Sequence, residues 1–83
     1  MKQVIFRTGQ TDGFLSWIAA NPDGFVVNWL QKGKLIVLHS AKCRTLQVKN
    51  IKGEKVCADK ATLNQWSLSR FRRKPDPCGA CNP

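Results

Sequence analysis

The chain has 83 residues, of which 14 are Lys or Arg and 5 are Asp or Glu, so its formal net charge is +9. A chain of this length forms one small domain with a marginal core, and its apolar runs fall far short of the roughly 18 residues that suggest a membrane-spanning helix. The first residues, MKQVIFRTGQ, lack the apolar region of a secretory signal peptide. We therefore expect a cytoplasmic protein that has no membrane partner.

The first third of the chain predicts a short strand followed by a helix. Residues 2–8 alternate weakly, as in a strand at the edge of a sheet. Residues 11–24 are expected to begin as a helix with Thr11 or Asp12 as N-cap, and Asn-Pro-Asp-Gly at 21–24 is expected to end it. Its apolar face consists of Phe14, Leu15, Trp17 and Ile18.

The middle of the chain predicts two β-hairpins. Residues 25–30 and 35–39 are β-rich runs joined by a short loop that contains Gly33, which is typical of a hairpin. Residues 40–46 are expected to form a tight turn or a single helical turn. Residues 47–58 predict a second hairpin with Lys52 and Gly53 at its tip.

The last third predicts a helix and then a loop. Residues 59–71 have Asp59 as N-cap and place Leu63, Trp66 and Arg70 on one face. Residues 72–77 are basic and interrupted by proline, so we expect a loop there. These patterns predict an α+β fold with two hairpins and two helices, forming one domain over residues 1–83.

Two close pairs of candidate metal ligands occur in the sequence. Three residues separate His39 from Cys43, and Cys78 and Cys81 form a C-x2-C knuckle. Three cysteines and one histidine are a common composition of structural zinc sites. We therefore predict one zinc ion bound by these four residues. Its role is expected to be structural, because four protein ligands leave no position for a catalytic water.

Other uses of the cysteines stay open at this point. A disulfide, such as Cys78–Cys81, would satisfy the same residues, although thiols in a reducing cytosol more often bind metal. Unpaired thiols are a further reading. Cys57 lies between Val56 and Ala58, as a small buried residue would. Its sulfur also offers an alternative to His39 in an all-cysteine site.

Positive charge is concentrated in the part of the chain that contains the candidate metal ligands. Residues 31–74 include twelve Lys and Arg residues but only two acidic residues, Glu54 and Asp59. Such a field attracts polyanions, and nucleic acid is the usual partner. We expect a basic rim around the zinc site that contacts phosphates. Its candidate residues are Lys42, Arg44, Arg70, Arg72, Arg73 and Lys74.

The segments LHSAKCRTL and PCGACNP resemble the metal-binding module of the Ada-type DNA methylphosphotriester repair proteins. The resemblance covers residues 35–83 and is closest to short Ada-like domains in which His replaces the first cysteine ligand. NPDGFVVN also resembles the lead-in of small bacterial and phage domains of unknown function. The resemblance implies a small α+β zinc domain that approaches the DNA backbone, with His39, Cys43, Cys78 and Cys81 as ligands. In the repair proteins the first ligand is the methyl-accepting thiolate, so His39 implies that this activity is absent.

These observations favour a non-enzymatic, zinc-stabilised domain that binds nucleic acid through its phosphates, with DNA as the first expectation. The alternative is a small basic interaction or inhibitor protein, for example encoded by a phage, that docks on a nucleic-acid-processing enzyme of a bacterial defence system. A third reading, a residual alkyl acceptor using Cys43 or Cys57, is disfavoured. The chain lacks a shared motif of paired carboxylates and a glycine loop that cradles phosphate.

Overall fold

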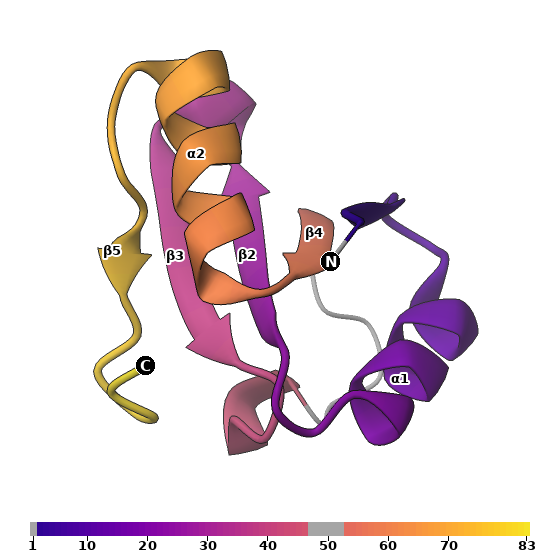
Figure 1. Cartoon of the computed structure of the whole chain (residues 1–83). Helices are drawn as coiled ribbons and strands as arrows, with labels where there is room; N and C mark the ends of the chain where they lie inside the picture. Colours follow the sequence, from indigo (N-terminus) through magenta and orange to yellow (C-terminus); the bar gives the residue numbers. More distant parts are fainter. Residues whose placement is uncertain (1, 47–52) are drawn as a thin grey trace.

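The computed structural model describes residues 2–46 and 53–83 and contains a five-stranded sheet and two helices, which confirms the α+β class. The elements in chain order are β1 (Val4–Phe6), α1 (Thr11–Ala20), β2 (Phe25–Leu30), the 3-10 turn η1 (Gln31–Gly33), β3 (Leu35–Ser40), the 3-10 turn η2 (Arg44–Leu46), β4 (Glu54–Ala58), α2 (Lys60–Phe71) and β5 (Asp76–Pro77) (Figure 1). No helix in the described part of the chain is long and apolar enough to cross a membrane.

The strands lie in the order β1-β4-β2-β3-β5. The expected hairpin of β2 and β3 is confirmed, with a register that runs from Phe25 opposite Ser40 to Leu30 opposite Leu35. β1 lies at one edge of the sheet, as expected, and is antiparallel to β4. β5 forms the other edge and is parallel to β3, as Figure 1 shows. The sheet therefore brings the end of the chain alongside the strand that contains His39.

The expected second hairpin differs from what the structure shows. Residues 47–52 lie outside the described residues, and the segment after them forms β4. β4 pairs with β1 on one side and with β2 on the other, so it has no free edge for a hairpin partner. Its run of buried residues, Lys55 to Ala58, is typical of a strand covered on both faces. The expected loop at 72–77 is also wrong in part, because β5 lies within it.

The two helices cover opposite faces of the sheet. Successive side chains of each strand point to opposite faces, so each face contributes to its own core. On one face α2 packs over a core that includes Val27, Ile36 and Leu63. On the other face α1 contributes Phe14 and Ile18 to a second core. This second core contains Cys43, Cys57 and Cys78. The candidate metal ligands thus belong to the α1 side of the molecule.

The helix ends agree only in part with the predicted caps. α1 has Gln10 at its N-cap and lacks a capping side chain, so the expectation of Thr11 or Asp12 there is wrong. α1 ends where expected, and the Asn21 side chain donates to the Trp17 carbonyl. Asp59 is the N-cap residue of α2, as expected. Its carboxylate accepts a hydrogen bond from the Thr62 hydroxyl, and this bond lowers the pKa of Asp59.

Candidate metal centre

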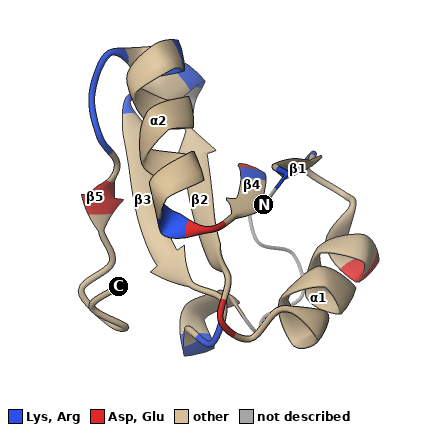
Figure 2. Ribbon diagram, viewed as in Figure 1, with Lys and Arg blue, Asp and Glu red and all other residues tan. Residues whose placement is uncertain are grey.

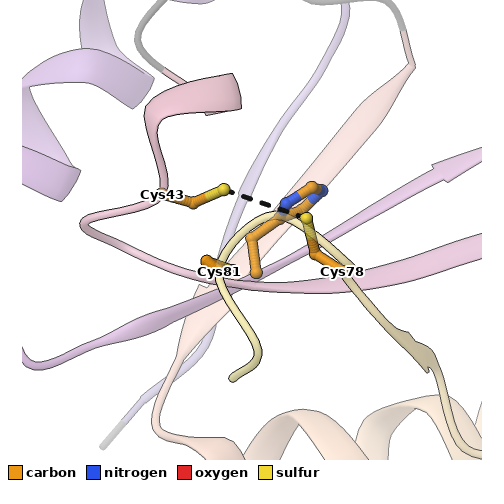
Figure 3. Close-up of side chains that lie close together, drawn as sticks. Cys43, Cys78 and Cys81 are labelled. Carbon is orange, nitrogen blue, oxygen red and sulfur yellow. Dashed lines mark hydrogen bonds between the residues drawn. The ribbon is translucent and has the colours of Figure 1, made fainter.

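The four predicted ligands come together in one group. One ligand atom from each of His39, Cys43, Cys78 and Cys81 lies within 4.8 Å of all the others. Figure 3 shows the three cysteines converging from two separate segments of the chain. The first three of the four residues are buried, and Cys81 is half-buried. The arrangement gives the fold a set of donors that can hold a metal ion.

The first pair of ligands is positioned by β3 and the turn that follows it. His39 is opposite Val26 in the β2–β3 register, so it lies on the α1 side of the sheet. The chain then reverses, with the Cys43 amide donating to the Ser40 carbonyl at 2.9 Å. Ala41 is anchored in the same turn by a hydrogen bond to the Gly24 carbonyl. The x3 spacing is thus a strand end plus a tight turn, which directs Cys43 back toward His39.

The second pair is positioned by β5. Pro77 is opposite Leu38, and the amide of Cys78 continues the pairing by donating to the Leu38 carbonyl at 2.9 Å. Pro77 lacks an N–H, which an edge strand tolerates. The Asn82 amide donates to the Cys78 carbonyl and closes the knuckle. The knuckle is therefore fixed to β3 one residue away from His39.

The spacing of the sulfurs fits a tetrahedral ion better than a disulfide. Cys43 Sγ and Cys78 Sγ are 3.9 Å apart, the pair joined by the dashed line in Figure 3. Two thiolates at the usual Zn–S distance of about 2.3 Å, at tetrahedral angles, are separated by about 3.8 Å. A disulfide needs sulfurs about 2.05 Å apart. All four cysteines are free thiols in the structure, so the disulfide reading is not supported.

Backbone and hydroxyl donors surround the sulfurs. The Ser40 amide donates to Cys81 Sγ at 3.3 Å, and the Ala80 amide donates to Cys78 Sγ at 3.4 Å. Cys43 Sγ is 3.0 Å from the Thr45 hydroxyl, which is also 3.5 Å from His39 Nδ1. Thr45 therefore contacts two candidate ligands from outside the group, and such contacts orient ligands. Thr45 is not among the residues that the sequence predicts for the site; its position two residues after a cysteine is the only sequence signal for it.

The protonation of the ligands follows from this environment. Burial raises the pKa of Cys78, but hydrogen bonds from the amides of Ala80 and Cys81 and from the thiols of Cys43 and Cys81 together hold that pKa below its usual value. The pKa of Cys81 is raised to about 11, by burial first and by the neighbouring Cys43. Burial lowers the pKa of His39, which favours the neutral imidazole that a metal requires. A bound cation would stabilise the three thiolates together.

Cys57 lies outside the group. It is fully buried in β4 and is opposite Val26, while His39 is opposite Val26 on the other side of β2. Two strand spacings, about 9.6 Å, therefore separate the backbones of Cys57 and His39. Burial raises the pKa of Cys57 to about 12, against the opposing charge of Lys55. The described structure thus favours His39 over Cys57 as the fourth ligand.

The candidate phosphate-binding residues form two groups instead of one rim. Lys42 and Arg44 are exposed on either side of Cys43. The residues at 70–74 lie at the far end of β3, where Arg73 donates to the carbonyls of Gly33 and Lys34. Figure 2 shows the two groups of basic positions at different ends of the molecule. The six residues of β3, Leu35–Ser40, separate them by about 20 Å.

Arg73 differs from the other candidates because the fold already uses its guanidinium. Besides the two carbonyls, it pairs with Asp76 at 3.6 Å, and its own carbonyl accepts from the buried Ser67 hydroxyl. These contacts hold the loop against β3 and lead the chain into β5. Arg70, Arg72 and Lys74 are exposed.

Comparisons of the chain with protein-family models, with curated proteins and with solved structures found no match. The Ada-type resemblance of residues 35–83 therefore stays a prediction, carried by the spacing of its ligands.

Proposed function

We propose that the chain is a zinc-stabilised, non-enzymatic domain that binds nucleic acid through its phosphates. The observation that carries the metal part is the group of one imidazole and three thiols, with two sulfurs 3.9 Å apart. Zinc fits this set because it accepts N and S donors in tetrahedral sites, whereas calcium and magnesium prefer oxygen. Zinc binding in such sites contributes directly to folding free energy.

We expect the metal to have no catalytic role. Four protein ligands complete a tetrahedral shell and exclude the open position of catalytic zinc. His39 also occupies the position at which the Ada-type resemblance places a methyl-accepting thiolate. We expect no added methyl on the protein after incubation with methylated DNA, as measured by mass spectrometry.

Exposed cations support the nucleic-acid part of the proposal. Five of the six candidates, all except Arg73, are exposed and have no ion-pair partner among the residues that the structure describes. The two groups span about 20 Å, or about six steps along one strand of a duplex. Such spacing allows one nucleic-acid molecule to contact both groups.

Metal content in ligand variants tests the ligand set. The purified protein should contain one zinc per chain and should lose its secondary structure when a strong chelator removes the metal. Cys78→Ser should lose zinc, and Cys57→Ser is the matched control that should retain it. Retention of zinc by His39→Ala together with its loss from Cys57→Ser would overturn the ligand set.

Fluorescence anisotropy with labelled DNA tests the partner. The zinc-loaded protein should bind duplex DNA at about 50 mM salt, and the affinity should fall by about 10²–10³-fold at about 200 mM, as expected for about five phosphate contacts. Absence of binding to both duplex and single-stranded DNA at the lower salt, by a folded, zinc-loaded protein, would contradict the proposal. Capture of a protein partner that survives nuclease treatment would then favour the alternative of an interaction protein.

A further inference from the structure

A pocket lies between the last turn of α2 and the ends of β2 and β4, on the face of the sheet opposite the metal centre. Its lining includes Trp29, Lys32, Glu54, Arg70 and Phe71. Aromatic rings, two cations and a carboxylate thus converge in one hollow. Neither the metal centre nor the fold accounts for this combination.

The aromatic wall of the pocket is held firmly. Trp29 is buried, and its ring centroid lies 4.9 Å from Trp66 and 6.4 Å from Phe71. Gly33 has φ +96°, and a Cβ at this position would come within 2.5 Å of the Phe71 ring. The chain therefore uses glycine where it needs Phe71 to pack against η1. These contacts hold the half-buried Phe71 ring in place, and its edge gives the pocket an apolar surface.

The charged groups of the pocket are available for a ligand. Arg70 places its guanidinium 5.6 Å from the centroid of the Phe71 ring and 5.8 Å from that of Trp29. Glu54 is opposite Trp29 in the β2–β4 register, at the first residue of β4 and beside the end of β2. Within residues 2–46 and 53–83, neither Glu54 nor Arg70 takes part in an ion pair.

Two cations lie at the rim of the pocket. Lys32 lines it, and Arg72 directly follows Phe71 in the chain. Arg72 has φ +61° because it is the left-handed C-cap of α2, and its N–H donates to the Leu68 carbonyl. Lys32 has φ +58° inside η1, the left-handed region that favours glycine, and it is not a helix cap. A lysine kept in this conformation at a pocket is a candidate functional position.

We propose that this pocket receives the base of an unpaired nucleotide, so that the protein prefers single-stranded nucleic acid. The base would lie against Phe71 and the Arg70 guanidinium, and Lys32 and Arg72 would contact the flanking phosphates. Glu54 would accept a hydrogen bond from an exocyclic amino group, which cytosine has and thymine lacks. The inference rests on the proposed nucleic-acid binding and specifies the form of that ligand.

Anisotropy with oligo-dC, oligo-dT and a duplex, each of about 12 nucleotides or base pairs, tests the inference, since single-strand sites span about 4–16 nucleotides. Oligo-dC should bind more tightly than both the duplex and oligo-dT. Phe71→Leu should weaken oligo-dC binding by about 5- to 150-fold, the range for loss of one stacked base. Glu54→Gln should reduce the dC-to-dT affinity ratio while strengthening oligo-dT binding, because it removes a negative charge.

Lys32→Gly separates a binding role from a structural one. It should raise the melting temperature, because glycine relieves the left-handed strain, and it should weaken oligo-dC binding. Lys42→Ala, at the metal end, is the control that should leave the dC-to-dT ratio unchanged.

Equal affinity for duplex and oligo-dC, or a dC-to-dT ratio that Glu54→Gln leaves unchanged, would overturn the inference and leave the proposed function intact. Binding to neither duplex nor single strand by the zinc-loaded protein would overturn both.

Discussion

The four cysteines have the same side chain but different surroundings. Cys43, Cys78 and Cys81 are near N–H or hydroxyl donors, and they face one another and His39. Cys57 lies in an apolar environment in a central strand. Spacing in the sequence predicted this difference, because H-x3-C and C-x2-C are short enough to place two ligands from one turn. Thr45 could not be predicted, because its role depends on how the turn folds back over His39.

The buried thiol of Cys57 should make the protein sensitive to alkaline pH. Burial raises the pKa of Cys57 from 9.0 to about 12, so the folded state keeps the proton that the unfolded state releases. The contribution of Cys57 to the free energy of unfolding is therefore complete below pH 9 and is lost as the pH rises toward 12. The zinc-loaded protein should lose more stability over this range than its Cys57→Ala variant, as measured by urea unfolding at several pH values.

Lys55 contributes with the opposite sign over part of this range. Burial lowers the pKa of Lys55, so deprotonation of Lys55 relieves a cost of the folded state as the pH rises. The comparison with Cys57→Ala isolates the thiol because both proteins retain Lys55. Equal alkaline stability loss in the two proteins would contradict the assignment.

At the scale of elements, the local patterns were sufficient for both helices, the β2–β3 hairpin and the edge position of β1. The β4 pairing was not predicted, since it joins segments far apart in the chain and no local turn specifies it. β5 was missed for a related reason: only two residues pair, and one of them is proline. Yet β5 brings the knuckle to His39, so the part of the fold that builds the site is the part with the weakest local signal.

Gly33, the last residue of η1, should be one of the least replaceable residues of the turns. Gly33→Ala would impose a left-handed conformation on alanine and press its Cβ against the Phe71 ring. We expect a loss of about 2–4 kcal/mol in the free energy of unfolding, from backbone strain and overpacking together. Chemical denaturation of the zinc-loaded protein measures the loss.

Gly79→Ala is the matched control, because a Cβ at Gly79 meets nothing within 4 Å. It should change stability by less than about 0.5 kcal/mol. A similar loss in both variants would show that the contact between Gly33 and Phe71 does not matter to the fold.

At the scale of the whole molecule, the metal centre and the aromatic pocket lie on opposite faces of the sheet, each beside a group of cations. The net charge of +9 was readable from the composition. Its division into two groups was not, because the loop before β5 runs back along β3 and moves residues 70–74 away from the cysteine knuckle they precede. A small domain with two separate basic ends is suited to contact an extended polyanion.

Salt dependence should distinguish the two ends. For duplex DNA, the double variant Lys42→Ala/Arg44→Ala should reduce the slope of log K against log salt by about 2, and Arg70→Ala/Arg72→Ala should do the same. Lys2→Ala, in the N-terminal segment, is the control variant and should leave this slope unchanged. If either double variant left the slope unchanged, that end would not contact the phosphates.

X-ray absorption at the zinc edge tests the central claim most directly, because it counts the ligand atoms around the metal. The ligand group of His39, Cys43, Cys78 and Cys81 predicts three sulfurs at about 2.3 Å and one nitrogen at about 2.0 Å. The Cys57→Ser variant should give the same spectrum. A shell of four sulfurs, a shell with a coordinated water oxygen, or a purified protein that binds no zinc would contradict the account.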